Sequence, residues 1–268
     1  MQKVILITGA TDGIGFETAR ALVKLGHHVI VHGRNPEKCQ HTVDELKAIN
    51  PNALVESIVA DLSDLTAVNN MTREVAERYG KIDVLINNAG IYNTPNSVNK
   101  DGLDVRFVVN TVAPYLLTKE LLPLLTQSGR VVNLSSAAQA PVNVDAIGTN
   151  LNLSDGEAYA QSKLALTMWS RYLGLANKTS GPMIVSVNPK SLLGSKMVKE
   201  AYGIAGGNLQ LGADILVKAA LSDEFAQAHG LYFDNDVEKF APPHVQALDD
   251  HHVSKVIQAL ESVIQRFA

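Results

Sequence analysis

The residues most suited to chemistry lie in the second half of the chain, at Ser136, Tyr159 and Lys163. Residues four apart share one face of a helix, so a helix across this region directs the Tyr159 hydroxyl and the Lys163 ammonium into one pocket. A nearby positive charge favours the phenolate, lowers the pKa of tyrosine and makes it a usable proton donor. Ser136 ends a predicted strand with a hydroxyl that can donate to a carbonyl oxygen. The ordinary alternatives are an interfacial tyrosine beside a solvated lysine, and a serine in a turn.

A glycine-rich turn from Thr8 to Gly15 supplies a second kind of chemistry near the N-terminus. It follows the apolar run Val4 to Ile7 and precedes a helical pattern from Phe16 to Leu25. Backbone N–H groups and the helix dipole at such a strand–turn–helix junction favour the pyrophosphate of a dinucleotide. The glycines are spaced G-x-x-x-G-x-G, and the cofactor contacts that we expect from this turn are Gly9, Thr11, Asp12, Gly13, Ile14 and Gly15.

Polar and small residues also follow three later predicted strands. No carboxylate follows the second strand, whereas Arg34 there can pair with a 2′-phosphate, so we predict NADP(H) and consider NAD(H) less favoured. A solvated surface arginine is the alternative. An aspartate after the third strand can accept a hydrogen bond from the adenine amino group. Small residues after the fourth strand let the backbone approach the cofactor. The alternative is that these residues only form turns, in which Asp, Asn and Gly are common. The expected cofactor contacts at these strand ends are Arg34, Asn35, Asp61, Leu62, Asn88, Ala89 and Gly90.

Short apolar runs alternate with amphipathic segments of helix length, a rhythm typical of βαβ units. Runs such as Val131-Val132 lack strict alternation, as in parallel strands covered by helices on both faces. We therefore predict a single α/β domain over residues 1–268, with a doubly wound Rossmann sheet that binds its ligand outside the carboxyl ends of the strands. The predicted strands are Lys3–Thr8, His28–His32, Leu54–Ala60, Val84–Asn87, Arg130–Ser135, Met183–Val187 and Gly230–Asp234.

Composition excludes several classes of partner. The net charge of −4 and the absence of a Lys/Arg run give no attraction to nucleic acid. Cys39 is the only cysteine, so no intrachain disulfide forms and a cytoplasmic location is expected. The apolar start Val4 to Ile7 is too short for a signal or membrane segment. The adjacent pairs His27-His28 and His251-His252 direct their rings apart, so no metal is expected.

Taken together, these motifs resemble the short-chain dehydrogenase/reductase family over nearly the whole chain. The glycine motif of the family matches Thr8 to Gly15, its N-N-A-G motif matches Asn87 to Gly90, and its Y-x-x-x-K motif matches Tyr159 to Lys163. The resemblance implies a seven-stranded parallel sheet in the order 3-2-1-4-5-6-7.

The resemblance also implies a role for each matching residue. Tyr159 is then the proton donor, and Lys163 both tunes it and holds the nicotinamide ribose hydroxyls. Ser136 polarises the substrate carbonyl, with Ser135 the weaker candidate. Asn110 corresponds to the helix asparagine that holds an ordered water.

The segment between Ser136 and Tyr159 is long for the family, and in this the chain is similar to the retinol-dehydrogenase-like branch. Members of that branch act on lipophilic aldehydes, ketones or alcohols. One departure follows the sixth strand, where Pro189-Lys190 replaces the Pro-Gly pattern of the family. Lys190 either constrains the loop over the nicotinamide or takes an ordinary conformation with its side chain in solvent. Pro189 and Leu192 of this loop are expected cofactor contacts. The following segment, 197–211, corresponds to the mobile substrate lid of the family or is a solvated loop.

We therefore predict an NADP(H)-dependent oxidoreductase that interconverts a carbonyl and an alcohol by hydride transfer, with a small, lipophilic substrate. Helices around Tyr115–Leu125 and Tyr159–Leu175 are the usual dimer surface of the family, so a homo-oligomer is one expectation. The alternative is that the apolar faces of these helices simply cover the sheet. The alternative function is a non-catalytic NADP(H)-binding protein that senses redox state through a partner. The intact catalytic set argues against that alternative, whereas Lys190 leaves it open.

Overall fold

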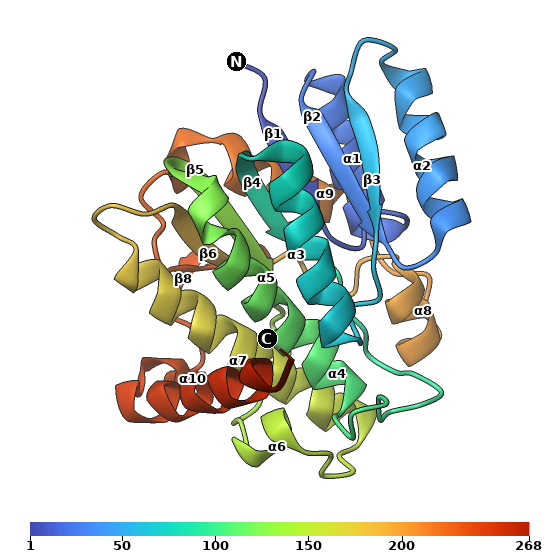
Figure 1. The fold of residues 1–268 in the computed structure, drawn as a ribbon. Coiled ribbons are helices and arrows are strands. Elements are labelled where there is room, and N and C mark those ends of the chain that lie inside the picture. Colours follow the sequence, from blue (N-terminus) through green and yellow to red (C-terminus); the bar gives the residue numbers. More distant parts are fainter. Residues whose placement is uncertain (268) are drawn as a thin grey trace.

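A twisted eight-stranded sheet forms the centre of the computed structural model, which describes residues 1–267 (Figure 1). The sheet order is β3-β2-β1-β4-β5-β6-β7-β8, and the pairs from β3 to β7 are all parallel. This confirms the predicted Rossmann-type order. The strands are β1 (Val4–Ile7), β2 (His28–Gly33), β3 (Val55–Val59), β4 (Ile82–Asn87), β5 (Leu125–Leu134), β6 (Met183–Asn188), β7 (Tyr232–Asp234) and β8 (Lys239–Ala241).

The eighth strand adds to the predicted sheet of seven. β8 pairs antiparallel with β7, placing Phe233 opposite Phe240. These two rings and that of Phe225 pack with centroids 5.0 to 5.2 Å apart. A three-residue strand is too short to show a period-two pattern, so this aromatic packing, and not local sequence, determines it. The sheet is therefore mixed at one edge.

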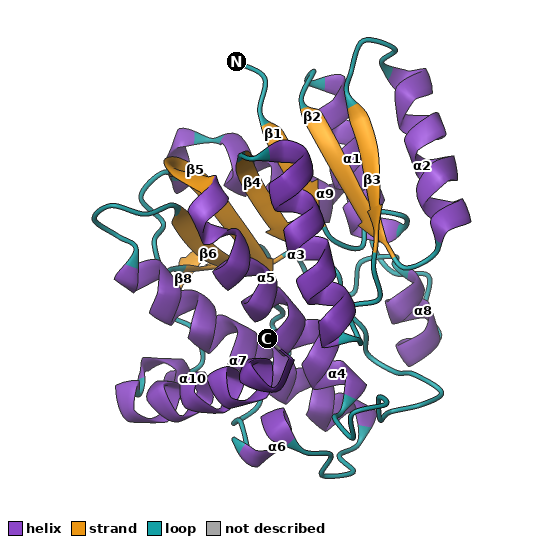
Figure 2. Cartoon of the chain, in the orientation of Figure 1, coloured by secondary structure: helices purple, strands orange, loops and turns teal. Residues whose placement is uncertain are grey.

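Helices cover both faces of the sheet (Figures 1 and 2). The helices α1, α2 and α9 pack on one face, and α3, α5, α7 and α10 contribute to the core on the other. Between α4 and α5 lies a π-helical turn, Val108–Val112. The α-helices are α1 (Gly13–Lys24), α2 (Pro36–Ile49), α3 (Leu65–Tyr79), α4 (Val105–Phe107), α5 (Ala113–Leu121), α6 (Asp145–Gly148), α7 (Asp155–Ala176), α8 (Lys196–Tyr202), α9 (Leu209–Leu221) and α10 (Asp250–Ile264). The 3-10 turns are Leu122–Leu124, Asp223–Phe225, Val245–Leu248 and Gln265–Phe267.

Alternation along each strand explains the continuous apolar runs in the sequence. Ile5 and Ile7 belong to the core under α1 and α9, whereas Leu6 belongs to the core under α3 and α7. Val84 and Leu85 divide between the two cores in the same way. Because helices cover both faces of the sheet, neighbouring residues in the middle of β1 and β4 are apolar whichever face they point to.

Local capping fixes where the helices nearest the strand ends begin. The Asp12 side chain accepts from the first N–H of α1, and Asn35 accepts from Lys38 N–H at the start of α2. A capping box of Ser154 and Glu157 begins α7, so Tyr159 lies in the first turns of that helix. These caps hold three helix N-termini at the carboxyl edge of the sheet.

The helix α10 covers α5 and α7. Tyr115 of α5 and Trp169 of α7 are buried, with ring centroids 5.6 Å apart. Glu261 of α10 accepts hydrogen bonds from the Tyr115 hydroxyl and the Lys119 ammonium, each at 2.5 Å. Much of the apolar surface that the sequence associated with a dimer is therefore buried within this chain.

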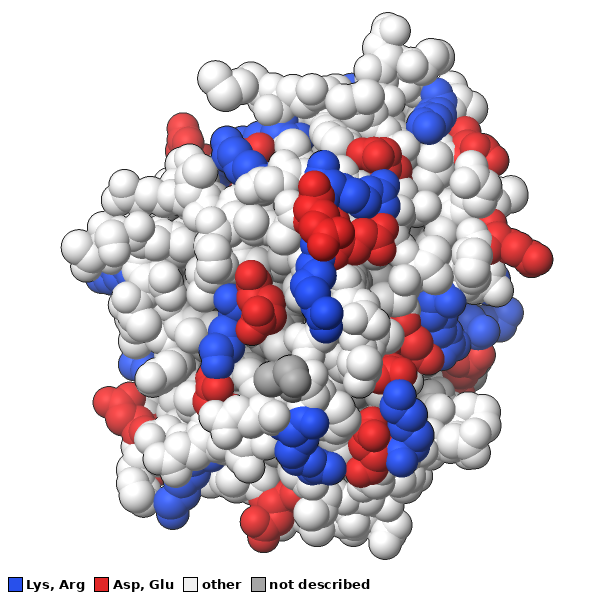
Figure 3. Space-filling view, in the orientation of Figure 1, with Lys and Arg blue, Asp and Glu red and all other residues white. Residues whose placement is uncertain are grey.

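Positive and negative side chains are interspersed on the molecular face that Figure 3 shows. Several form ion pairs, including Lys119 with Glu261 and Lys100 with Asp64. Within residues 1–267, no helix combines the length and apolar character needed to cross a bilayer.

Candidate active site

A cavity of about 1660 Å³ opens at the carboxyl ends of the strands. The glycine-rich turn, the ends of β2 to β6, α7 and α8 all contribute to its wall. Among the sequence-predicted catalytic residues, Ser136, Tyr159 and Lys163 line it. The predicted cofactor contacts that line it are Gly9, Thr11, Asp12, Gly13, Ile14, Gly15, Arg34, Asn35, Asp61, Leu62, Asn88, Ala89, Gly90, Pro189 and Leu192.

The glycine-rich turn is packed directly against the N-N-A-G loop. A side chain on Gly15 would place its Cβ 2.3 Å from the Gly9 carbonyl oxygen and 2.4 Å from the Asn88 amide nitrogen. Gly9 itself has φ +63°, in the region that favours glycine. Asn88 donates to the carbonyl oxygens of Thr8 and Gly9 at 2.9 and 3.0 Å. These contacts join the two loops and leave no room for a methyl group at Gly9 or Gly15.

His32, at the end of β2, also lines the cavity, although it was not predicted from the sequence. It is buried, accepts from Gly9 N–H through Nδ1 at 3.2 Å and donates from Nε2 to the Ala60 carbonyl oxygen at 3.0 Å. Burial lowers its pKa to about 4, so the ring is neutral and its tautomer is fixed by these two bonds. His32 thus ties the glycine-rich turn to the end of β3. A polar residue closing the apolar run Val29 to Val31 was the available signal.

The adenosine side of the cavity carries the predicted cation. Arg34 is exposed at the rim, and Lys38 of α2 also lines the cavity although the sequence analysis did not name it. Asn35 and Asp61 line the same rim, but each also serves its own turn: Asn35 caps α2, and Asp61 accepts from Ser63 N–H at 2.9 Å. Two cations beside one rim suit a phosphate better than a neutral ribose.

The helix α7 brings Tyr159 and Lys163 together as the spacing predicted. The Lys163 ammonium lies 5.7 Å from the centroid of the Tyr159 ring and donates to the Leu134 carbonyl oxygen at 2.7 Å. Asn110 does not line the cavity. It lies buried in the π-helical turn behind it, where its side chain bonds both backbone groups of Ile91 and donates to the Ser162 hydroxyl at 3.0 Å.

Burial dominates the proton equilibria of this pair. Burial raises the pKa of Tyr159, and the neighbouring Ser136 hydroxyl acts in the opposite direction. The expected lowering of the Tyr159 pKa is therefore wrong for the protein alone, because desolvation of the phenolate outweighs its polar neighbours. Burial also lowers the pKa of Lys163 to about 8.

The two serines at the end of β5 have different surroundings. Ser135 is buried and its hydroxyl pairs with Thr167 Oγ1 at 2.6 Å. The Ser136 hydroxyl accepts a hydrogen bond from Ala138 N–H at 3.1 Å. Against the effect of burial, Ser136 also lowers the pKa of Tyr159 through a side-chain hydrogen bond, so its hydroxyl faces the cavity beside Tyr159, whereas that of Ser135 serves the protein interior.

Lys190 adopts a conformation that favours glycine, with φ +121°. The interpretation of this position as conformationally ordinary is therefore wrong. Its ammonium donates weakly to the Asn235 carbonyl oxygen at 3.4 Å, and the neighbouring Ser191 donates to Asp236 through both N–H and hydroxyl. Asp236 also accepts from Asn188 at 2.8 Å. The loop after β7 thus holds the loop after β6 in a strained shape.

The segment expected as a lid contains a helix. Ser195 caps α8, and Gly203, at φ +67°, ends it; the loop residues that follow lead to α9 at Leu209. Tyr202 of α8 lies 5.8 Å from Tyr92, whose ring lies 5.2 Å from that of Tyr159. The helix therefore forms a wall of the cavity beside the predicted proton donor.

The order of the sheet and the glycine-rich turn at its switch point define a Rossmann-type dinucleotide-binding fold. The family model for short chain dehydrogenases matches residues 3–202, and the chain belongs to this family. It is therefore a dehydrogenase-type oxidoreductase, as predicted.

Relatives confirm the predicted branch. The chain is 29% identical to retinol dehydrogenase 13 of Mus musculus over 263 residues, covering 91% of this chain and 79% of the relative. It is 37% identical to polyprenol dehydrogenase of Homo sapiens over 179 residues, covering 64% of this chain and 54% of the relative. The match thus spans about half the length of the polyprenol dehydrogenase.

Solved structures confirm the fold class. A protein from Mycobacterium Paratuberculosis superposes with a TM-score of 0.79 at 27% identity, covering 98% of this chain and 94% of that one. A short chain dehydrogenase from Burkholderia cenocepacia, in complex with NADP, gives a TM-score of 0.70 at 24% identity, covering 87% and 95%.

Proposed function

We propose that this protein is an NADP(H)-dependent oxidoreductase that interconverts a carbonyl and an alcohol, with Tyr159 as general acid and base. The observation that carries the proposal is the presence of Ser136, Tyr159 and Lys163 in the same cavity as the glycine-rich turn.

The residues present fit a dinucleotide. Gly9, Gly13 and Gly15 leave part of the turn without side chains at the N-terminus of α1, where the helix dipole and backbone N–H groups favour a pyrophosphate. Arg34 and Lys38 line the cavity and would supply positive charge to a 2′-phosphate, and the structural neighbour with bound NADP supports this choice. The remaining strand-end residues would line the adenosine and nicotinamide portions of the cofactor; they are Asp61, Leu62, Asn88, Ala89, Gly90, Pro189 and Leu192.

When bound, the nicotinamide supplies or accepts the hydride. Ser136 would donate to the carbonyl oxygen and stabilise the charge that develops there. Tyr159 would donate its hydroxyl proton to the same oxygen. Lys163 would favour the resulting phenolate by its charge and hold the ribose hydroxyls. Asn110 would support this group from behind, since it bonds Ile91 and Ser162 and does not itself face the cavity.

The finer features of the proposal are a lipophilic substrate and a cytoplasmic location. The dehydrogenases named for retinol and polyprenol support a lipophilic substrate, and the single cysteine supports a reducing compartment. A homo-oligomer would have to use surface other than the parts of α5 and α7 that α10 covers. Light scattering of the purified chain and localisation of the tagged protein test these two features.

Oxidation of NADPH in the presence of a panel of aldehydes and ketones tests the activity. We expect a loss of absorbance at the nicotinamide wavelength that depends on the added carbonyl. Tight NADPH binding without turnover of any panel member contradicts the proposal and favours the non-catalytic redox sensor, which the strained Lys190 loop keeps as the second candidate.

Arg34→Ala tests the cofactor choice. Loss of a charge-assisted pair to a phosphate costs about 1.5 to 3 kcal/mol, which is roughly tenfold or more in affinity. NADPH binding, measured by fluorescence titration, should weaken by that factor, while NADH binding should change little. Equal losses with both cofactors, or a wild-type preference for NADH, contradict the assignment.

A further inference from the structure

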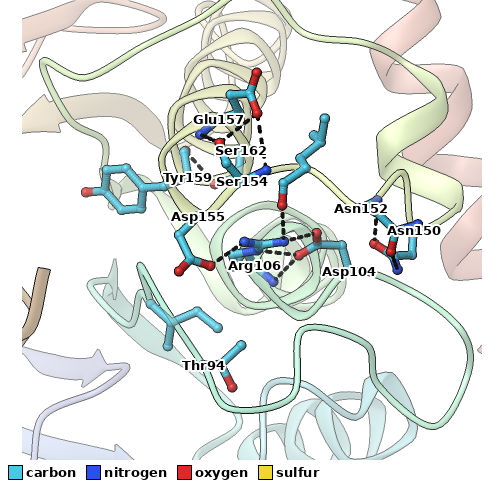
Figure 4. Close-up of polar contacts among 12 residues, drawn as sticks. Thr94, Asp104, Arg106, Asn150, Asn152, Ser154, Asp155, Glu157, Tyr159 and Ser162 are labelled. Atoms are coloured by element: carbon cyan, nitrogen blue, oxygen red, sulfur yellow. Dashed lines mark hydrogen bonds and ion pairs between the residues drawn. The ribbon is translucent and has the colours of Figure 1, made fainter.

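Behind the wall of the cavity near Tyr159 lies a buried arginine that the proposed mechanism does not use. Arg106, in α4, is 2% exposed and lies between two carboxylates (Figure 4). Its Nε and Nη2 donate to the two oxygens of Asp104 at 2.9 and 2.7 Å, and Nη1 donates to Asp155 Oδ1 at 2.5 Å. Nη2 also donates to the Leu153 carbonyl oxygen at 3.1 Å. All three nitrogens of the guanidinium group are thus engaged.

The charges of this group do not balance. Asp104 is as buried as Arg106 and pairs with it through both oxygens, so these two residues form a neutral buried pair. Asp155 brings a second carboxylate to the same guanidinium, and its side chain is 49% exposed. One cation therefore faces two anions, and the excess negative charge lies on the carboxylate that reaches the cavity.

Asp155 shares its side of α7 with the predicted proton donor. It is the first residue of the helix, one turn before Tyr159, and both residues line the cavity. In Figure 4 the Asp155 carboxylate and the Tyr159 ring point to the same side of α7. Hydrogen bonds of the described residues occupy only Oδ1 of Asp155, so Oδ2 is available to a ligand.

The same wall carries three tyrosines and two lysines, Lys163 and Lys196. The Lys163 ammonium donates to the Leu134 carbonyl oxygen, and Lys196 pairs with Glu200. Within residues 1–267, Asp155 therefore forms an ion pair with Arg106 alone. Tyr92 packs between Tyr159 and Tyr202, and its hydroxyl lies 3.2 Å from where a Cβ on Gly156 would stand. Burial raises the pKa of Tyr92, with smaller contributions from Tyr202 and from the charge of Asp155. The field of Asp155 therefore reaches the surface on which a substrate would rest.

We propose that Asp155, fixed in place by Arg106, is a specificity-determining residue that binds a positively charged nitrogen of the substrate. The preferred substrates are then carbonyl compounds, or the corresponding alcohols, with an ammonium group about one helical turn from the reacting oxygen. This inference rests on the proposed function, because it uses Tyr159 to place the carbonyl. Arg106 acts only as a positioning residue for the carboxylate.

A matched pair of aldehydes tests the proposal. The dimethylaminomethyl group is cationic at neutral pH and has nearly the shape of an isobutyl group. We would measure kcat/KM with NADPH for the 3- and 4-dimethylaminomethyl benzaldehydes and for their isobutyl counterparts. The cationic member should be preferred about five- to tenfold in at least one pair, as expected of a partly exposed charge pair. Asp155→Asn keeps an acceptor for Arg106, and should abolish the preference while changing kcat/KM for the isobutyl aldehyde less than twofold.

Glu157→Gln is the control, because it removes the same charge from the same turn of α7, keeps a capping-box residue and lies outside the cavity lining. It should retain the preference. A preference that is absent in the wild type, that survives Asp155→Asn, or that is lost equally in Glu157→Gln overturns the proposal.

Binding separates this proposal from the proposed activity. The affinities of the corresponding benzyl alcohols for the NADP⁺-loaded protein, measured by calorimetry, should show the same five- to tenfold preference for the cationic member and the same loss in Asp155→Asn. Equal affinities overturn the specificity proposal whatever the turnover. The expected binding preference without turnover of any aldehyde supports the Asp155 site and contradicts the reductase activity.

Discussion

The two ends of the cavity are built in different ways. At the cofactor end, Gly9 and Gly15 pack against each other, Ala89 and the Asn88 side chain, and the buried His32 ties the turn to Ala60 at the end of β3. At the substrate end, the wall consists of side chains from the loop after β4 and from α4, α7 and α8, such as Tyr92, Asp155 and Tyr202. The first arrangement leaves no room for change, whereas the second can be altered one side chain at a time. One fold can therefore keep its cofactor while its substrate varies.

Tyr159 lies where the two ends meet, and its replacement should have the largest effect. Tyr159→Phe keeps the ring that packs against Tyr92 but removes the hydroxyl. Turnover of an aldehyde should fall by roughly 10²- to 10⁴-fold, as general acids typically contribute. NADPH affinity should change less than about twofold. A variant that keeps most of its turnover means that another group donates the proton. Lys163→Ala, in contrast, should weaken both NADPH binding and turnover.

Two glycines test directly whether the cofactor end is the less tolerant one. Gly15→Ala drives a Cβ into the Gly9 carbonyl, so overpacking of up to about 3 kcal/mol should weaken NADPH binding by up to roughly a hundredfold. Gly156→Ala, at the substrate end, meets only the movable hydroxyl of Tyr92 and should leave NADPH affinity unchanged. Fluorescence titration compares the two variants. Similar affinities would remove the distinction between the ends.

His32 makes the cofactor end sensitive to acid. The unfolded chain takes up a proton on this histidine near pH 6.5, but the folded chain does so only near pH 4. Stability is therefore lost as the pH falls through this window, by about 2 kcal/mol between pH 7 and pH 5. Urea unfolding at both pH values should show this extra loss for the wild type relative to His32→Asn. Parallel losses in the two proteins would show that the histidine is not held neutral.

Lys190 should give the smallest effect. Its strained backbone costs about 1 to 3 kcal/mol, and glycine removes the strain but adds up to about 1 kcal/mol of unfolded-chain entropy. Lys190→Gly should therefore raise the unfolding free energy by about 1 kcal/mol. Lys190→Ala removes the same side chain but keeps a Cβ, so it should bring no gain. Urea unfolding of both variants measures the difference, and equal stabilities would show that φ at this position is not costly.

The sequence predicted the cofactor end better than the substrate end for a physical reason. Glycine spacing, helix caps and apolar strands are local signals, and the spacing of Tyr159 and Lys163 follows from the helix repeat alone. The strand order and the cavity lining at Gly9 to Gly15 agree with those signals.

Contacts between distant segments escaped prediction. Arg106 meets Asp155 across 49 positions of the chain, and His32 bridges strands that are consecutive in the sheet but separated by helices. The pKa of Tyr159 also depends on how deeply the fold buries it, which no local pattern records. Lys190 departs from the family pattern, which marks the position in the sequence, but its φ angle is a property of the finished loop.

The position of α10 also has a consequence for how the protein is made. Tyr115 and Trp169 lie beneath or beside this helix, yet α8, α9, β7 and β8 all come between α7 and α10 along the chain. A ribosome therefore releases the helix that carries Tyr159 well before the helix that covers it. During that interval an aromatic surface is open to chaperones and to other nascent chains. Synthesis that pauses before Asp250 should favour aggregation, whatever the stability of the finished protein.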